Sequence, residues 1–518
     1  MTYLTIPISG KDLKTCKEQI TAAVKTGAEM LELRTDYLEG LNTDKLRELV
    51  KSAQQTALPL IVTCRDSAQG GQNNLPPAVR GQILAEAIRL GADFIDCEYV
   101  NFTKKDFGEA IKKALSAASK TKLILSAHNF NGSFENLDSI YEKIFAAWPA
   151  AIAKTAYQAN HINDCFAAFD ILKKYGNKAI AICMGPAGII SRIIAKKLDA
   201  FLTFASVEEN QTTAQGQLTI EKMKKLYRFD IINSKTELFG VIGDPVKHSI
   251  GPVAHNACFA AEKMNRVYLP LLVSGSQREF NEFLDNITTR PWLDFRGFSV
   301  TIPHKTSAIE YARTKGEYVE PLAVKIGAVN TLIIGLNERI TGYNSDYAGA
   351  MDALTSAMGI KRKQLHSKSA AVIGAGGAAR AIIAGLVDVG AKVTIYNRTV
   401  SKAHSLASEF GCHSAGLEDI EKMDARIVIN CTSIGMSPNT DASPLPIKCL
   451  RKDMIVFDTV YNPLQTLLLK QAKQAGAQTV SGAEMFINQA AEQFKLFTHK
   501  DCPMEILRQT TVKALGEK

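Results

Sequence analysis

Short apolar runs alternate with amphipathic stretches over about the first 230 residues of the chain. Apolar runs of this length predict β-strands, and apolar residues that recur every three or four positions predict the helices between them. Strands that alternate with helices indicate a parallel sheet, and eight of them predict a (β/α)₈ barrel. The predicted strands are 3–8, 30–34, 58–65, 94–99, 122–128, 151–157, 178–185 and 201–206, and the clearest predicted helices are 43–55, 80–90, 137–147 and 161–175.

The pattern changes after this segment. A helical stretch at 220–229 ends the predicted barrel, the polar segment 233–236 is the predicted junction, and a strand restarts at 238–243. Further on, an apolar strand at 370–373 runs into a glycine turn and a helix, and a second strand follows at 392–396. This order is typical of a Rossmann nucleotide-binding domain. The fold class that we predict is therefore α/β: a TIM barrel followed by a two-lobed α/β half with a Rossmann domain.

Composition narrows the class of protein. The chain has 518 residues, too many for one compact core, and its net charge of +9 is scattered, with no basic block of the kind that binds nucleic acid. No stretch approaches the roughly 18 apolar residues of a membrane helix, and the N-terminus lacks a signal-peptide core. None of the ten cysteines forms a C-x-x-C pair, which argues against a zinc site and for a reducing compartment. We expect a cytoplasmic protein that acts on small molecules, without metal, membrane or nucleic acid; a removed organelle-targeting segment and the oligomeric state, monomer included, stay open.

One lysine, Lys154, stands in the middle of the apolar strand 151–157. Loss of water around an ammonium lowers its pKa, and a neutral amine can attack a ketone to form a Schiff base. The alternative is a structural lysine whose stem packs while its charged end reaches solvent.

Other polar residues fall at the ends of the predicted barrel strands, where the active sites of such barrels lie. Arginines at this rim can bind a carboxylate through two hydrogen bonds, and they disfavour a charged lysine beside them. Each residue has a structural alternative by itself, for example a surface pair between Arg34 and Asp36, but their convergence indicates a site. The candidates are Glu32, Arg34, Arg65, His128, Arg192, Thr213 and Gln217.

The glycine turn after strand 370–373 is a candidate phosphate site. Glycines let the backbone approach a pyrophosphate, and the following helix offers N–H donors at its N-terminus. About 20 residues further on, an acidic residue would select NAD, but this chain has Arg398, which suits the 2′-phosphate of NADP(H). The candidate cofactor-binding residues here are Gly374, Ala375, Gly376, Gly377, Ala378, Asn397, Arg398, Thr399 and Lys402.

Upstream of this turn, four polar segments at strand or turn ends could together line a pocket for a polyhydroxylated ring. They are 243–256, 300–305, 327–331 and 342–346. Lys305 and Asp346 are the natural pair for proton transfer to a carbonyl oxygen. A structural salt bridge between these two residues is the alternative.

The first half resembles type I 3-dehydroquinate dehydratases. The resemblance implies that Lys154 forms an imine with the C3 ketone of 3-dehydroquinate, while His128 removes the C2 proton and then protonates the departing C1 hydroxyl. Arg192 with Gln217 would hold the carboxylate, and Glu32, Arg34 and Arg65 would order the ring and the lysine. Two positions depart from the family: Gln69 replaces a glutamate near His128, and Thr213 replaces a serine. The matching strings are 32–36, Arg65 with Gly70-Gly71, 126–130, 153–154, 191–192 and 216–217.

The second half resembles shikimate dehydrogenases. The resemblance implies NADPH as cofactor and reduction of the C3 ketone of 3-dehydroshikimate, with Lys305 supplying the proton and Asp346 as its partner. It further assigns Ser249, Thr301, Asn330, Tyr461 and Gln489 to the substrate, and Thr432 and Gly482 to the cofactor. The matching strings, besides the four polar segments and the glycine turn, are 430–436, 458–464 and 482–490.

One further departure concerns specificity. Gly251 stands where this family usually has a second serine, so a hydroxyl is lost and space is gained beside the substrate carboxylate. Quinate carries an extra hydroxyl on that carbon, and we expect weakened shikimate binding with some tolerance of quinate.

The two resemblances cover nearly the whole chain, and the product of the first reaction is the substrate of the second. We expect a barrel at 1–232, a substrate-binding domain at 237–345, a Rossmann NADP-binding domain at 346–481 and C-terminal helices at 482–518 that pack back on the substrate domain. Three alternatives stay open: a Schiff-base aldolase in the barrel, a quinate dehydrogenase in the second half, and a ligand-sensing regulator built from inactive copies of both.

Overall fold

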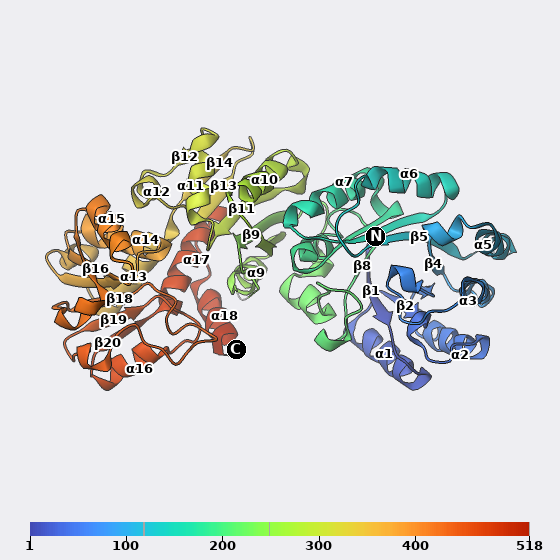
Figure 1. Cartoon of the computed structure of the whole chain (residues 1–518), viewed down its shortest axis with the longest axis horizontal. Helices are drawn as coiled ribbons and strands as arrows, with labels where there is room; N and C mark the ends of the chain where they lie inside the picture. The colour runs from blue at the N-terminus through green and yellow to red at the C-terminus, as the bar shows by residue number, and fades with distance from the viewer. Residues whose placement is uncertain (118–119, 248, 517–518) are drawn as a thin grey trace. The chain divides into compact units, whose positions relative to one another are not determined.

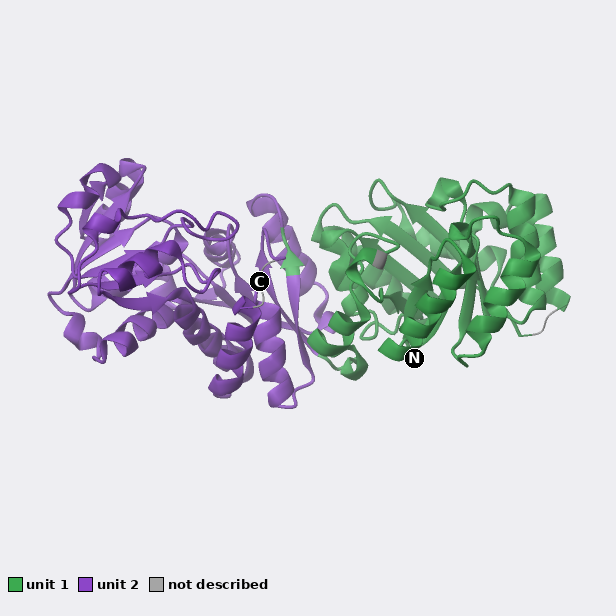
Figure 2. Cartoon of the chain, turned by 90° about the horizontal axis from the view of Figure 1, so that it is seen from below, with its two compact units in different colours: residues 1–236, 271–273 green, residues 237–270, 274–518 purple. Residues whose placement is uncertain are grey.

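The computed structural model describes residues 1–117, 120–247 and 249–516 and divides into two compact units. Unit 1 comprises Met1–Thr236 with Leu271–Val273, and unit 2 comprises Glu237–Pro270 and Ser274–Lys518 (Figure 2). The last two residues of the predicted segment 482–518 lie outside the described residues.

Unit 1 contains an eight-stranded sheet in the order β7-β6-β5-β4-β3-β2-β1-β8, and each hydrogen-bonded pair of neighbours is parallel. The two end strands meet where the amide of Phe201 donates to the carbonyl of Ala179 at 2.9 Å. The predicted barrel is therefore confirmed as a near-closed parallel sheet. Its strands are β1 (Tyr3–Ile8), β2 (Met30–Arg34), β3 (Leu60–Thr63), β4 (Phe94–Glu98), β5 (Lys122–Asn129), β6 (Ile152–Gln158), β7 (Ala179–Met184) and β8 (Leu202–Phe204).

Helices surround these strands (Figure 1). Their starts follow ordinary capping chemistry: Asn42, for example, accepts a hydrogen bond from the amide of Lys45. The predicted helix 80–90 begins earlier, at Pro77, because proline is tolerated in a first helical turn. The helices are α1 (Leu13–Thr26), α2 (Thr43–Gln54), α3 (Pro77–Arg89), α4 (Tyr99–Phe102), α5 (Lys105–Ala117), α6 (Leu137–Ala147), α7 (Cys165–Tyr175) and α8 (Ile189–Ile193).

The side chains inside the barrel differ between the amino and the carboxyl ends of its strands. Alternate residues of a strand face the same side, so each strand contributes a short inward column. At the amino ends these columns are apolar and form one buried cluster. Further along, the columns of β2 to β5 and Lys154 of β6 are polar or charged, whereas Ile182 of β7 and Phe204 of β8 stay apolar. The apolar cluster includes Met30, Ile61, Phe94, Ile124, Ile152, Ile180 and Leu202, and the polar residues that follow include Glu32, Arg34, Thr63, Asp96, Glu98, Ser126, His128 and Lys154.

Unit 2 begins with a mixed six-stranded sheet in the order β10-β9-β11-β13-β14-β12. Strands β9 and β11 are parallel, and β13 runs antiparallel to both β11 and β14. The elements are β9 (Glu237–Gly243), α9 (Gly251–Ala261), β10 (Arg266–Leu272), α10 (Gln277–Thr288), β11 (Phe295–Val300), α11 (Lys305–Thr314), β12 (Tyr318–Val319), α12 (Pro321–Ile326), β13 (Thr331–Ile334) and β14 (Ile340–Tyr343).

A second six-stranded sheet follows, entirely parallel, in the order β17-β16-β15-β18-β19-β20. The strand order reverses between β15 and β18, and dinucleotides bind at such a switch point. The predicted Rossmann domain is thus confirmed. Its elements are α13 (Ser345–Met358), β15 (Ser369–Ile373), α14 (Gly377–Asp388), β16 (Lys392–Asn397), α15 (Val400–Phe410), β17 (His413–Gly416), β18 (Ile427–Asn430), β19 (Ile455–Asp458), α16 (Leu467–Gln474) and β20 (Gln478–Ser481).

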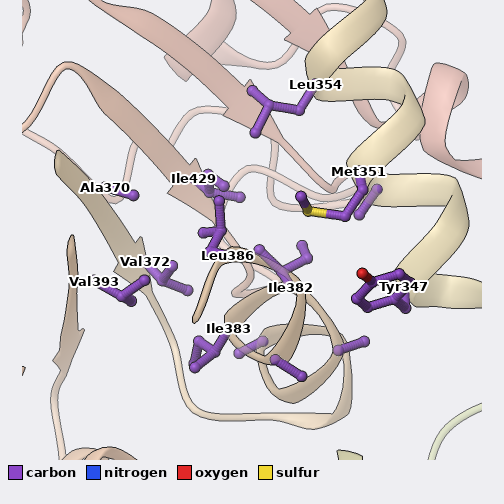
Figure 3. Close-up of a cluster of buried hydrophobic side chains, with 14 of the residues drawn as sticks. Tyr347, Met351, Leu354, Ala370, Val372, Ile382, Ile383, Leu386, Val393 and Ile429 are labelled. Atoms are coloured by element: carbon purple, nitrogen blue, oxygen red, sulfur yellow. The ribbon is translucent and has the colours of Figure 1, made fainter. Parts of the chain in front are cut away.

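The largest apolar cluster of this sheet lies on the face that α13 and α14 cover. Figure 3 shows Tyr347 and Met351 of α13 facing Ile382 and Leu386 of α14. The two last helices, α17 (Gly482–Thr498) and α18 (Met504–Gly516), contact α13 and α9, respectively. Among the described residues, no helix combines the length and apolarity that crossing a bilayer needs.

Candidate active sites

A pocket lies at the carboxyl ends of the barrel strands. About 590 Å³ of empty space lies in it and in its open mouth. The structure brings together in its wall every residue that the sequence analysis assigned to the first half. These residues are Glu32, Arg34, Arg65, His128, Lys154, Arg192, Thr213 and Gln217, with Gln69, Phe130 and Phe204 beside them.

Lys154 projects from β6 into this pocket and is 5% exposed. Its Nζ donates to Asp96 Oδ2 at 2.7 Å and lies 3.8 Å from Glu32 Oε1. The ring of Phe204 packs against the same nitrogen, 4.8 Å from it to the ring centroid. The lysine is therefore buried, as predicted, but a carboxylate balances its charge directly.

The sequence analysis missed that carboxylate. Asp96 lies fully buried on β4, where Ser126 Oγ donates to it at 2.6 Å and Arg65 contacts it at 2.9 Å. Burial alone would raise the pKa of Asp96, but the positive charges of Arg65 and Lys154 outweigh burial and hold that pKa well below its ordinary value. A signal existed, because Asp96 and Glu98 repeat in β4 the inward spacing that Glu32 and Arg34 show in β2.

Arg65 also faces a second buried acid. Its NH1 donates to Glu98 Oε1 at 2.9 Å, and the other oxygen of Glu98 accepts from Arg80 at 2.9 Å. Arg80 in turn donates to Asp66 at 2.7 Å. Burial lowers the pKa of Arg65, but the charges of Asp96 and Glu98 outweigh burial, so the pKa is raised overall. The guanidinium of Arg65 is thus held charged between two carboxylates.

His128 lies at the end of β5, with its Nδ1 3.0 Å from Gln69 Oε1. Because an amide oxygen only accepts, Nδ1 carries the proton in this contact and Nε2 keeps its lone pair. Burial, together with the charges of Arg65 and Lys154, holds the pKa of His128 well below its ordinary value. The ring is therefore a neutral base at neutral pH.

Arg192 differs from the other arginines of the pocket. It is 1% exposed, and among the described residues no carboxylate pairs with it. Its helix is anchored beside it, because Ser191 Oγ donates to Gly188 O at 2.7 Å and accepts from the amide of Cys183. Burial lowers the pKa of Arg192 to about 10, so the guanidinium stays charged at neutral pH. A buried cation of this kind is stabilised when an anion binds beside it.

Three remaining pocket residues support the wall. Arg34 forms two hydrogen bonds, of 2.9 and 2.8 Å, with Asp36, which is fully buried, so this pair is part of the pocket and not a surface pair. Gln217 accepts from the amide of Thr213 at 2.9 Å and donates to Ala205 O at 3.1 Å. Gln217 thereby fixes the loop that carries Thr213.

In unit 2, Lys305 Nζ donates to Asp346 Oδ2 at 2.5 Å. Lys305 begins α11, and Asp346 lies in the first turn of α13, whose N-cap Asn344 accepts from the Asp346 amide. A Cβ on Gly377 would lie 3.4 Å from Lys305 Cδ. The lysine therefore contacts the glycine turn of the Rossmann domain.

The glycine turn leaves room for a ligand. Gly374 has φ +110°, and a Cβ there would meet Thr432 Cγ2 at 3.1 Å, so a side chain is excluded where β15 approaches the end of β18. A Cβ on Gly376, the N-cap of α14, would meet nothing within 4 Å. Ala375 and Ala378 flank this open turn. The amino end of α14 thus faces open space at the switch point, the geometry that accepts a phosphate.

Beyond β16, the candidate 2′-phosphate residues are exposed. Asn397 donates to the carbonyl of Thr399 at 2.9 Å and so shapes the turn into α15. Arg398 and Lys402 both face solvent, and among the described residues no carboxylate pairs with either. Two unpaired cations at the end of the second Rossmann strand suit an anionic group.

The predicted ring-binding residues of unit 2 lie on several elements. Asn330 is buried, donates to Ser345 Oγ at 3.0 Å and accepts from the Ser345 amide at 2.8 Å, next to Asp346. The Thr301 amide donates to Ile242 O at 2.9 Å, which places Thr301 at the end of β9. Ser249 Oγ accepts from the amide of Gly251 at 3.2 Å.

Three more residues complete the predicted set. Tyr461 packs in one apolar cluster with Ile250, the residue between Ser249 and Gly251. Gln489 of α17 lies against Gly349 of α13, three residues after Asp346. A Cβ on Gly482 would meet the carbonyl of Thr459 at 2.5 Å, so only glycine lets α17 start there. Unit 2 therefore brings Tyr461 into the cluster of Ile250, the residue after Ser249, and Gln489 to the helix of Asp346.

Comparisons with known proteins agree with this division. A model of type I 3-dehydroquinase matches residues 4–234, and a model of the shikimate dehydrogenase substrate-binding domain matches 241–332. The shikimate/quinate 5-dehydrogenase model matches 357–438, and the shikimate 5′-dehydrogenase C-terminal domain matches 482–510.

Individual relatives extend the match over the chain. The bifunctional 3-dehydroquinate dehydratase/shikimate dehydrogenase, chloroplastic, of Arabidopsis thaliana is 35% identical and covers 99% of this chain and 84% of its own. The shikimate dehydrogenase (NADP(+)) of Methanosarcina barkeri is 40% identical over 54% of this chain and 99% of its own. A crystal structure of a shikimate dehydrogenase in complex with NADP⁺ is 37% identical and superposes with a TM-score of 0.50, covering 55% of this chain and 97% of its own.

The contact between His128 and Gln69 leads to a testable prediction. Gln69→Glu puts a carboxylate against Nδ1, which favours the charged ring, so we expect the pKa of His128 to rise by about 1 unit or more. Titration of the imidazole carbon resonances by NMR measures it. Gln55→Glu, at an exposed position after α2, adds the same charge as a control and should leave His128 unchanged. An unchanged midpoint in Gln69→Glu would mean that Gln69 does not contact the ring in solution.

Proposed function

The chain belongs to the family of bifunctional 3-dehydroquinate dehydratase/shikimate dehydrogenases, and from this premise we propose how its residues divide the two reactions. It is a lyase that converts 3-dehydroquinate to 3-dehydroshikimate and an oxidoreductase that reduces 3-dehydroshikimate to shikimate. One observation carries the first assignment. Lys154 and Arg192 are both buried and line the same pocket, and Arg192 pairs with no carboxylate of the described residues.

In the barrel, the amine of Lys154 attacks the C3 ketone of 3-dehydroquinate, and loss of water gives an imine. The imine withdraws electrons and acidifies the C2 proton, which Nε2 of His128 removes. The resulting enamine expels the C1 hydroxyl, and the imidazolium of His128 returns the proton, so that water leaves. Hydrolysis of the imine then frees Lys154 and releases 3-dehydroshikimate.

The charges around the pocket support these roles. Arg192 lacks an acidic partner among the described side chains, and the substrate carboxylate would balance it through two hydrogen bonds. Asp96 accepts from Lys154 at 2.7 Å and so holds the reacting nitrogen in place. Glu32, Arg34, Arg65 and the Thr213–Gln217 loop complete the wall and hold the ring.

In unit 2 we assign proton transfer to Lys305. Its ammonium donates to the C3 carbonyl oxygen of 3-dehydroshikimate as that oxygen gains charge, and Asp346, 2.5 Å away, orients the lysine. Ser249, Gly251, Thr301, Asn330, Tyr461 and Gln489 would surround the ring and its carboxylate.

NADP(H) fits the residues of the Rossmann domain. The open turn around Gly376 and the amino end of α14 would hold the pyrophosphate, with Thr432 beside it. Gly482, which lies against Thr459 after β19, would face another part of the cofactor. Arg398 and Lys402 would hold the 2′-phosphate, and Asn397 and Thr399 shape their turn. When bound, NADPH supplies the hydride for the reduction. The related shikimate dehydrogenase in complex with NADP⁺ supports this choice of cofactor.

The proposed domain limits follow the sequence. We assign the dehydratase to 1–232, the substrate-binding domain to 237–345, the NADP-binding domain to 346–481 and the C-terminal helices to 482–518. The contacts of α17 with β11 and β13, and of α18 with α9, support a return of these helices to the substrate-binding domain.

Gly251 favours quinate as a second substrate of unit 2. A Cβ at this position would lie 3.3 Å from both Ser249 Oγ and Tyr268 Cε1, so any side chain would crowd the wall beside Ser249. Without a side chain at position 251, Ser249 and Tyr268 are not pushed apart, and the wall beside Ser249 can accept the extra hydroxyl of quinate.

Two single variants test the division of labour. Lys154→Met should lower dehydration of 3-dehydroquinate by about 10³-fold or more and leave reduction of added 3-dehydroshikimate intact, because the imine cannot form. Lys305→Met should do the reverse. Separate assays of enone formation and of NADPH oxidation measure the two steps. In each variant, the activity of the unchanged unit is the internal reference. Dehydration that survives in Lys154→Met would refute the barrel mechanism.

The cofactor assignment has its own test. Arg398→Ala should raise KM for NADPH by about 10-fold or more and leave KM for NADH nearly unchanged, because only NADPH carries the 2′-phosphate. Arg426→Ala removes an exposed arginine before β18, at the opposite end of the same sheet, and should change neither value. Equal effects on both cofactors would remove Arg398 from the 2′-phosphate site.

The specificity of unit 2 is tested at position 251. Gly251→Ser should lower the ratio of kcat/KM for quinate to that for shikimate by roughly 10-fold, because it fills the free space and adds a hydroxyl for the carboxylate. Gly251→Ala fills the space without the hydroxyl, so it separates the two effects. If Gly251→Ser leaves the ratio unchanged, the quinate proposal fails.

A further inference from the structure

A row of alternating charges runs from Lys154 away from the pocket. Lys154 contacts Asp96 at 2.7 Å, and Arg65 contacts Asp96 on one side and Glu98 on the other, at 2.9 Å each. Arg80 of α3 contacts the remaining oxygen of Glu98 at 2.9 Å. The row thus reaches Arg80, a cation that the proposed mechanism does not use.

Arg80 is buried, at 1% exposed, and it does not line the pocket. Its second nitrogen donates to Asp66 at 2.7 Å, and Asn101 bridges Asp66 and Glu98 with hydrogen bonds of 2.8 and 2.9 Å. Asp66 directly follows Arg65 in the chain, and Glu98 pairs with Arg65. Arg80 therefore binds both the backbone neighbour of Arg65 and its acidic partner. Arg80 cannot reach the substrate, so any influence on the reaction passes through these neighbours.

We propose that Arg80 is a positioning residue that acts through Glu98 and Arg65 to set how strongly Asp96 holds the proton on Lys154. The inference rests on the proposed Schiff-base role of Lys154 and adds a residue outside the pocket to it.

The direction of the effect follows from the geometry. Arg65 pairs with both Asp96 and Glu98. Arg80 pairs with the Glu98 oxygen that Arg65 does not contact and so partly neutralises Glu98. Without Arg80, Glu98 draws Arg65 toward itself, and Asp96 is left to Lys154 alone. The lost positive charge and the strengthened Asp96 contact both favour the ammonium of Lys154 over the amine.

Removal of the Glu98 charge has the opposite effect. Arg65 then interacts more strongly with Asp96, so Asp96 stabilises the ammonium of Lys154 less. The neutral amine of Lys154 is therefore favoured. A merely structural role for Arg80 predicts something else: Arg80 and Glu98 variants would both lose activity with the same pH dependence. The sign of the pH shift therefore separates the two explanations.

Several other groups act on the same lysine and must stay unchanged in the experiment. They come from the strands and the helix around Lys154: Glu32 and Arg34 of β2, Arg65 after β3, Asp96 of β4, His128 of β5 and Arg192 of α8.

The experiment measures imine formation directly in the full-length protein. Borohydride adds hydride to the imine carbon and the nitrogen takes a proton, which leaves a stable secondary amine on Lys154. Mass spectrometry after incubation with 3-dehydroquinate at a series of pH values gives the midpoint pH of trapping. The variants are Arg80→Met, Arg80→Lys and Glu98→Gln, and the matched control is Arg47→Met, which breaks an ion pair with Glu86 between α2 and α3 outside the barrel.

We expect the midpoint to rise by roughly half a pH unit or more in Arg80→Met and to fall by a similar amount in Glu98→Gln. Arg80→Lys keeps the charge and should stay near the parent value, as should Arg47→Met. An adduct on Lys154 at the high end of the pH series reports that the barrel of each variant is folded.

The outcomes separate the two levels of the proposal. If Arg80→Met and Glu98→Gln shift the midpoint in the same direction or not at all, while the parent protein is trapped on Lys154, the role of Arg80 is overturned and the Schiff base stands. If the parent protein gives no adduct on Lys154, the Schiff-base mechanism itself fails. Should Arg80→Met not fold, the fall in Glu98→Gln and the parent-like midpoint of Arg80→Lys decide the question.

Discussion

The contact between Lys154 and Asp96 is the constraint on which the barrel site depends. An ammonium cannot be placed inside a closed sheet without an acid beside it, because the loss of hydration is too costly. The acid needs a further cation in turn, so one buried lysine requires charged or hydrogen-bonding residues on the neighbouring strands β2, β3, β4 and β5. The apolar layer below them, around Ile124 and Ile152, keeps water from reaching these groups from the other end.

The fold followed from the sequence because it depends on local patterns. Eight apolar runs with amphipathic stretches between them define the barrel, and the glycine turn after 370–373 defines the Rossmann domain. Element ends moved, as at Pro77, where proline starts a helix ahead of its amphipathic part. The predicted helix 220–229 differs more, because the structure has a π-helix at Lys222–Leu226 and a separate 3-10 turn at Phe229–Ile231. The residues of the barrel pocket could also be predicted. Polar side chains at the ends of apolar strands lie together at the carboxyl end of the barrel in this fold.

Other features depend on partners far away in the sequence, and these escaped the sequence analysis. Asp96 sits in an apolar strand as Lys154 does, but nothing local says that the two meet, although the alternation in β4 indicated an inward acid. Arg34 and Asp36 are neighbours in sequence, and only the structure shows that their pair is buried. The crowding of Gly251 by Tyr268 joins a helix start to a strand 17 residues later, a contact that no local motif encodes.

The solitary guanidinium of Arg192 has a practical consequence for work with this protein. A buried guanidinium that pairs with no carboxylate of the described residues attracts small oxyanions in general, sulfate and phosphate as well as the carboxylate of a metabolite. The ionic composition of the medium therefore belongs to the conditions under which the affinity of this pocket for an anionic substrate is defined.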